Sequence, residues 1–195
     1  MNIVNDARKL ALSKKSPPKV LFEISENKAL DLCGEFSEAN KVVVHVGVCL
    51  MDIMLEEALV ANKVSEHVQM CVIAAREFLA NYDIPQEDKD KIINCVEAHH
   101  KNVEFKCIEA EICANADCYR FIHPRGFFYY LILLGGERSQ EFSKVLDQAE
   151  YKIDEKRKIL SLQQCKDELA EYYDSLKKFI DDARNFKTEK TNSSY

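Results

Sequence analysis

The chain has 195 residues, of which 47% are hydrophobic and 31% are charged. This length and composition suffice for one hydrophobic core, so we expect a single domain over residues 1–195. The formal net charge of −6 and the pI near 5.5 argue against general nucleic-acid binding and against anionic membrane surfaces, because both need a basic surface. Any recognition of phosphate must therefore be local.

The cysteines and the apolar runs indicate the compartment. Eight cysteines are scattered through apolar stretches, and no two of them form a CxxC pair. The N-terminus lacks the pattern of a signal peptide, and the best apolar run, residues 127–134, is far shorter than the roughly 20 residues of a membrane helix. These features predict a reduced, cytoplasmic protein without a membrane segment.

Helical periodicity in nearly every long segment predicts an all-α fold. A first amphipathic piece ends at Ser16-Pro17-Pro18, and a helix over residues 21–36 follows it. The apolar run at residues 42–61 starts with β-branched residues, so a strand over residues 42–44 is an alternative. Apolar spacing through Leu55 favours one helix instead.

Three more helices are expected before the glycine pair at residues 135–136. Ser65 can cap the first of them, and Pro85 fits the first turn of the second, which reaches His99. The third should run from about Glu104 past Asp117. The segment up to residue 136 is thus predicted to be a bundle of helices.

Residues 138–187 are rich in charge, with apolar residues at intervals of three and four. They predict a C-terminal helical hairpin or extension on a core of about residues 20–136. One helix over residues 139–186 would be roughly 70 Å long, so we expect a break. Residues 161–164, Ser-Leu-Gln-Gln, fit a capping box that starts a new helix.

Two further expectations concern this C-terminal region. Residues 188–195 should be disordered. The apolar stripe of the extension either packs on the domain itself, which makes it structural, or stays exposed for a partner or a homodimer. The stripe consists of Phe142, Val145, Leu146, Ala149 and Ile153.

Histidines and acids follow one another in a suggestive order: Asp52, His67, His99, His100 and Asp117. Neutral imidazole together with carboxylate is the ligand set of borderline divalent metals such as Fe, Mn, Ni, Co or Zn. A centre of this kind suits hydrolysis. The order therefore predicts a divalent transition metal as cofactor.

These residues resemble the HD-domain superfamily of metal-dependent phosphohydrolases over roughly residues 22–125. Residues 46–53 are similar to the helix of the family's His-Asp pair, with Met51 in place of histidine and Asp52 retained. Residues 109–117 are similar to its late, acid-bearing helix. The resemblance implies an HD-like helical bundle that hydrolyses a small phosphate ester, such as a nucleotide, with water activated by the metal.

The same resemblance implies the site residues. Asp52, His67, His99, His100 and Asp117 match the family's metal ligands, and Asp52 and Asp117 would also be catalytic. The family's leading histidine is missing between residues 22 and 26, as is the one replaced by Met51. The downstream histidines therefore favour an enzyme, whereas the two losses favour an inactive HD-like domain that binds a ligand or a protein.

Several of these residues have a plainer interpretation. Adjacent residues on a helix diverge by about 100°, so His99 and His100 can share one metal only where the helix ends. The alternative for His100 is a solvated residue at the helix end that interacts with the free carbonyl groups there. Asp117 can pair with Arg120, three residues on along the same helix face.

Two additional sets of residues carry candidate ligands. For the phosphate group the candidate cations are Arg120 and Lys101, with Arg125 as a weaker choice. His45 and Cys49 share a helix face with Asp52, but we expect His45 to be half-buried and hydrogen-bonded, and Cys49 to be part of the core.

Overall fold

The computed structural model describes residues 2–100 and 103–186, and within these ranges it contains helices and no strand. The expected all-α bundle is therefore confirmed. Lys101 and the segment 188–195 lie outside the described residues. The helices are α1 Ile3–Ser13, α2 Lys19–Glu35, α3 Lys41–Leu50, α4 Leu55–Val60, α5 His67–Ala80, α6 Gln86–Ala98, α7 Ile108–Ile122, α8 Pro124–Ile132, α9 Phe142–Ile159 and α10 Gln163–Asn185.

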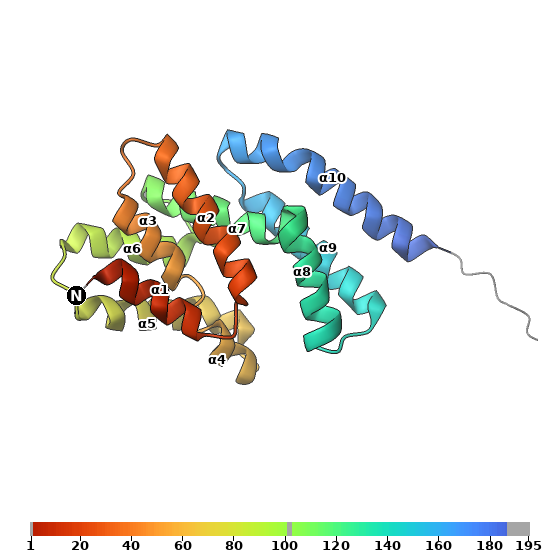
Figure 1. The fold of residues 1–195 in the computed structure, drawn as a ribbon, viewed down its shortest axis with the longest axis horizontal. Coiled ribbons are helices and arrows are strands. Elements are labelled where there is room, and N and C mark those ends of the chain that lie inside the picture. The colour runs from red at the N-terminus through yellow and green to blue at the C-terminus, as the bar shows by residue number, and fades with distance from the viewer. Residues whose placement is uncertain (1, 101–102, 187–195) are drawn as a thin grey trace, which may run out of the picture.

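Helix α7 is the centre of the bundle. It packs against α2, α3, α6, α8, α9 and α10, and Figure 1 shows it between the group α1 to α6 and the group α8 to α10. Of its 15 residues, 13 are buried. A helix buried on all sides places any polar side chain that it carries inside the protein.

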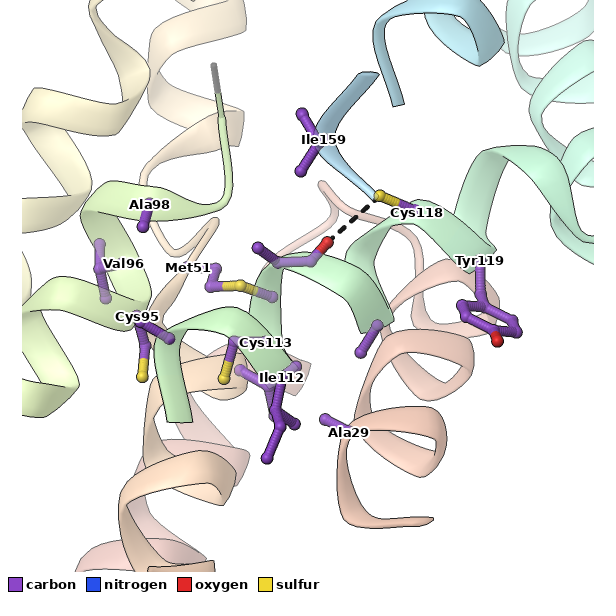
Figure 2. Packing of buried hydrophobic residues seen from close by; sticks show 14 of the residues in the cluster. Ala29, Met51, Cys95, Val96, Ala98, Ile112, Cys113, Cys118, Tyr119 and Ile159 are labelled. Carbon is purple, nitrogen blue, oxygen red and sulfur yellow. Dashed lines mark hydrogen bonds between the residues drawn. The ribbon is translucent and has the colours of Figure 1, made fainter. Parts of the chain in front are cut away.

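Small side chains let α3, α6 and α7 approach closely. A Cβ added at Gly47 of α3 would lie 2.6 Å from the Cβ of Cys95 on α6, so only glycine fits there. Figure 2 shows Met51 pointing into the same region, near Cys95, Ala98 and Cys113. Met51 is 1% exposed, so the residue at the position of the resemblance's missing histidine is part of the hydrophobic core.

The single helix expected over residues 42–61 is wrong, because the structure divides it into α3 and α4. Helix α3 ends at Leu50, and residues 51–54 form a turn in which the Leu55 N–H donates to the Asp52 carbonyl oxygen at 3.0 Å. Periodicity could not reveal this break, because Met51, Asp52 and Ile53 are all buried through tertiary contacts. The strand alternative at residues 42–44 does not occur.

Helices α9 and α10 form the expected hairpin. In the ion pairs between them, residue numbers rise along α10 as they fall along α9. Arg184 pairs with Asp147 at 2.9 Å, whereas Lys177 pairs with Asp154 at 3.1 Å. An antiparallel arrangement follows from this order. The expected break lies between Ile159, where α9 ends, and Gln163, where α10 starts.

The capping box expected at residues 161–164 is wrong in detail. The N-cap residue of α10 is Leu162, without a side-chain cap of its own. Instead, Asn115 of α7 accepts hydrogen bonds from the N–H groups of Ser161 and Leu162, both at 3.1 Å, and donates to the Ser161 hydroxyl at 2.8 Å. A side chain from the central helix thus fixes the corner between α9 and α10.

The apolar stripe of α9 packs on the domain itself. Val145, Leu146, Ala149 and Ile153 are at most 6% exposed, while Phe142 at the start of the helix is 66% exposed. The shared hydrophobic core also includes Ala7 and Ala11 of α1 and several residues of α10. The extension is therefore structural. All eight cysteines are free, and none of the described helices is both long and apolar enough to cross a membrane.

Candidate metal centre

Three histidines converge from two helices. His67 is the first residue of α5, and His99 and His100 follow the last residue of α6. One ring nitrogen of each lies within 4.8 Å of the others, a grouping that can hold a metal ion. Ser65, expected to cap α5, lies instead in the short 3₁₀ turn Val64–Glu66 and forms no cap.

The end of α6 explains how adjacent histidines share one site. The helix stops at Ala98, and His99 is its C-cap residue. The two rings, with centroids 4.4 Å apart, therefore leave the 100° spacing of a regular helix. His99 is fully buried, while the His100 side chain is 22% exposed. His99 and His100 thus lie where the helix ends, which is the condition under which both can bind one metal.

Asp52 completes the cluster from the turn after α3. Its Oδ1 atom lies 3.6 Å from His67 Nε2 and 3.5 Å from His99 Nε2. Ligand atoms around a tetrahedral ion with bonds of about 2.0–2.1 Å are about 3.3–3.4 Å apart. The two distances from Asp52 Oδ1 are thus close to the ligand spacing of a filled metal site.

The second ring nitrogen of each histidine has its own acceptor. His67 Nδ1 lies 2.6 Å from the Val64 carbonyl oxygen, and His99 Nδ1 lies 2.7 Å from that of Val96. His100 Nδ1 faces Glu155 Oε1 at 3.3 Å. These acceptors hold the proton on Nδ1 and leave the lone pair on Nε2, which is how metal-binding histidines are oriented.

His99 Nε2 provides the fit test for a metal. It is a buried polar atom without a hydrogen-bond partner in the described part of the chain. Such an atom costs free energy unless a ligand satisfies it. Its lone pair, the neighbouring imidazoles and Asp52 Oδ1 form a donor set that fits a borderline divalent ion.

Burial favours the neutral form of two of the imidazoles, His67 and His100. Burial lowers the pKa of His67 against the attraction of Asp52. Burial, followed by the charges of His99 and Lys156, lowers the pKa of His100 to about 3. Only neutral imidazole binds a metal, so these two histidines need not lose a proton to do so at neutral pH.

The other oxygen of Asp52 belongs to an ion network. Arg120 of α7 donates to Asp52 Oδ2 at 2.6 Å and also pairs with Asp117. Lys156 of α9 pairs with Asp117 and donates to the His99 carbonyl oxygen at 3.3 Å. Burial, the largest single influence, would raise the pKa of Asp52 and Asp117. Arg120 and the other nearby donors together outweigh it and hold the pKa of both carboxyls well below the usual range.

Asp117 therefore lies in the site as a counter-ion. Arg120 pairs with its Oδ1 and Lys156 pairs with its Oδ2, so both carboxylate oxygens are engaged by cations. The pairing with Arg120 that the sequence offered as an alternative is the arrangement found. Sequence reasoning missed Lys156, although it continues the buried stripe of α9 three residues after Ile153.

The side of Asp52 away from the histidines is closed. Phe22, in the segment where the resemblance lacks its leading histidine, lines a narrow cavity with Cys49, Asp52 and Arg120. Phe22 is 3% exposed. An apolar ring and a guanidinium thus occupy this side, and only Asp52 Oδ1 faces the imidazoles.

A pocket of about 520 Å³ opens over the centre. Asp52, His67 and His100 lie on its wall, as do the carboxylates of Glu97 and Glu155. Four cations also line it: Arg120, Arg138, Lys152 and Lys156. Its apolar and aromatic lining comprises Leu55, Leu59, Val64, Val68, Val103, Phe121, Tyr130 and Tyr151. Of the two expected phosphate ligands, Arg120 faces this pocket, and Lys101 lies outside the described residues.

Lys152 and Arg138 are cations that sequence reasoning missed. Lys152 stands one helical turn before Lys156 on α9, and this spacing was the only available signal. Its Nζ lies 2.6 Å from Glu155 Oε2. Burial, followed by the charge of Lys156, lowers the pKa of Lys152 against the attraction of Glu155.

The fold and the site define an all-helical protein with a buried histidine–carboxylate cluster that can hold a metal ion, at the wall of a cationic pocket. No protein-family model matches the chain, and neither a curated protein nor a solved structure gives a match.

Proposed function

We propose that the protein is a metal-dependent phosphohydrolase acting on a small phosphate ester, of which nucleotides are one class. The observation that supports this most is the convergence of three imidazoles, two of which face one carboxylate oxygen, beside a pocket with four cations. Donors for a metal and cations for an anionic substrate are the two requirements of metal-assisted phosphate hydrolysis.

One divalent ion, Fe, Mn, Ni, Co or Zn, would be held by His67, His99, His100 and Asp52 Oδ1. Such an ion would polarise a phosphoryl oxygen and make a nearby water molecule more acidic. Asp117 is proposed to act indirectly, because its charge keeps Arg120 in place against Asp52.

The remaining roles belong to the chain's own side chains. Arg120 orients Asp52 so that Oδ1 faces the imidazoles, and Glu155 orients His100 through Nδ1. Lys152 and Arg138 would bind the phosphate oxygens as charged donors. The apolar wall, with Tyr130 and Tyr151, would bind the organic part of the ester.

The first test is the metal content of full-length protein purified without a histidine tag or chelator. His67→Ala should lose one equivalent of transition metal and the phosphatase activity towards a panel of phosphate esters, with unchanged helical circular dichroism. The matched control is His123→Ala, a histidine outside the cluster, which should keep both. Equal metal content in His67→Ala and wild type would contradict the assignment.

Substrate binding is tested separately from the metal. Lys152→Ala should keep the metal but raise KM for a phosphate ester by about 10- to 100-fold, the value of one hydrogen bond to a charged group. Tyr151→Phe, in the same pocket wall, should leave the affinity for phosphate unchanged. An unaltered KM in Lys152→Ala would exclude this lysine as a phosphate ligand.

A catalytically inactive HD-like binding module is the second candidate. Arg120 and Lys156 neutralise Asp117, which removes one carboxylate from any catalytic role at a metal. This candidate predicts that the protein binds metal and phosphate esters without turnover. Calorimetry with the panel, beside the activity assay, separates the two functions. Sedimentation tests the homodimer that the sequence left open as an alternative.

A further inference from the structure

A second group of metal-ligating side chains lies apart from the histidine centre. Glu26 of α2 and His45 and Cys49 of α3 each offer a ligand atom, and these atoms lie within 4.8 Å of one another. His45 and Cys49 are four residues apart, so they lie on one face of α3. The group shares no residue with the centre around Asp52.

The contacts of this group converge on one carboxylate oxygen. Glu26 Oε1 accepts from Arg8 Nε at 2.7 Å and lies 2.9 Å from His45 Nε2. The Glu26 side chain is 4% exposed and that of His45 is 18% exposed, so the expected half-buried, hydrogen-bonded histidine is confirmed. Cys49, 2% exposed, belongs to the core as expected.

We propose that Glu26, His45 and Cys49 form a second metal site that takes a divalent ion with affinity for sulfur, such as Zn²⁺. Thiolate, imidazole and carboxylate are the three side-chain ligands that zinc uses in proteins. They come from two helices that pack against each other, α2 and α3, and this packing fixes their spacing before an ion arrives.

Arg8 is the cation that the ion replaces. It makes a single contact to the carboxylate through Nε, and its side chain is 40% exposed, so it can turn into the solvent. A divalent ion compensates the charge of Glu26 more strongly than one guanidinium does. On binding, the Cys49 thiol releases one proton to the solvent, and the His45 imidazole takes the neutral tautomer with its proton on Nδ1, so that Nε2 offers its lone pair. Water fills the fourth position.

The thiolate gives this site a signature that the histidine centre lacks. When the full-length protein is titrated with Co²⁺, ligation by Cys49 should produce a thiolate-to-cobalt charge-transfer band in the near ultraviolet. Cys49→Ser should lose the band and one equivalent of cobalt while keeping the equivalent that depends on His67. Cys165→Ser, at a buried cysteine of α10, is the matched control and should keep the band.

Arg8→Ala distinguishes a metal site from an ordinary ion network. If Arg8 competes with the ion for Glu26 Oε1, its removal should tighten cobalt binding by roughly two- to fivefold, as expected for a partly exposed ion pair. The band should appear at correspondingly lower cobalt concentration. His67→Ala should not change it.

Two results would overturn the proposal. One is the absence of the band at saturating Co²⁺ in both wild type and Arg8→Ala. The other is a band that persists in Cys49→Ser. Neither result depends on phosphatase activity, so the fate of the second site and that of the proposed function are decided separately.

Discussion

The two carboxylate oxygens of Asp52 have different partners. Oδ2 accepts from Arg120 at 2.6 Å, while Oδ1 faces His67 and His99 at 3.6 and 3.5 Å. The guanidinium fixes the rotation of the carboxylate and keeps it ionised. A ligand fixed in this way loses little conformational entropy when a metal binds.

The buried charges around Asp117 predict a large stability effect. Asp117→Asn leaves Lys156, which is 0% exposed, without its carboxylate. Breaking a buried pair from one side typically costs about 3–5 kcal/mol, so the free energy of unfolding should fall by that amount in urea. Asp147→Asn, at an exposed pair with Arg184, should change it by less than about 0.5 kcal/mol.

The same carboxylate predicts how stability depends on pH. Its folded-state pKa lies below its ordinary value of 3.8, so the unfolded chain takes up the proton first as pH falls. The stabilisation is fully present above about pH 4 and is lost below it. Urea midpoints of metal-free protein between pH 3 and 7 should drop more steeply for wild type than for Asp117→Asn, and parallel curves would refute this role.

Helix α7 organises the neighbouring elements with polar side chains that face inward. Asn115 binds the corner between α9 and α10, and Arg120 binds Asp52 in the turn after α3. A Cβ added at Gly126 would lie 2.3 Å from the Arg120 carbonyl oxygen, so α8 can approach this residue only through glycine. The position of the site thus depends on how α8 and α9 dock on α7.

Asn115→Ala should loosen that docking. It leaves the N–H groups of Ser161 and Leu162 without their acceptor, and each buried unsatisfied donor costs about 1–3 kcal/mol. We expect the unfolding free energy to fall by about 2–4 kcal/mol and amide exchange at the start of α10 to accelerate. Ser161→Ala removes one side-chain contact and should cost about 1 kcal/mol. Equal effects would contradict the cap.

The whole molecule shares one core between its two groups of helices. Lys156 of α9 reaches the ion network of α7, and Ile153 of the same helix is 1% exposed against the bundle. We therefore expect the C-terminal extension to be required for folding. The sequence had instead suggested a separate core of about residues 20–136.

Removal of residues 138–195 tests this dependence. The shortened chain exposes the surface covered by α9 and leaves Asp117 without Lys156, so it should lose cooperative unfolding and near-ultraviolet circular dichroism. A chain that ends at residue 186 is the control and should unfold as the full protein does. Cooperative unfolding of the shorter form, with one ion bound, would show that the extension is dispensable.

Local pattern determined the helices and the order of the site residues. Apolar periodicity predicts most of the elements because each amphipathic helix must bury one face. The histidine and acid series marked the cluster of Asp52, His67, His99 and His100 before any geometry was known. The sequence also predicts that the helix ends near His99 and His100, and this end explains how the two histidines share a site.

Tertiary structure alone decided the rest. Two features join residues that are distant in the sequence: the capping of α10 by Asn115 and the pairing of Asp117 with Lys156. The break after Leu50 lies in a segment that is buried by tertiary contacts. Periodicity reports which face of a helix is buried, whereas the identity of the partner depends on how the helices pack. For that reason the sequence indicated a site, and packing determined which carboxylate oxygen faces the imidazoles.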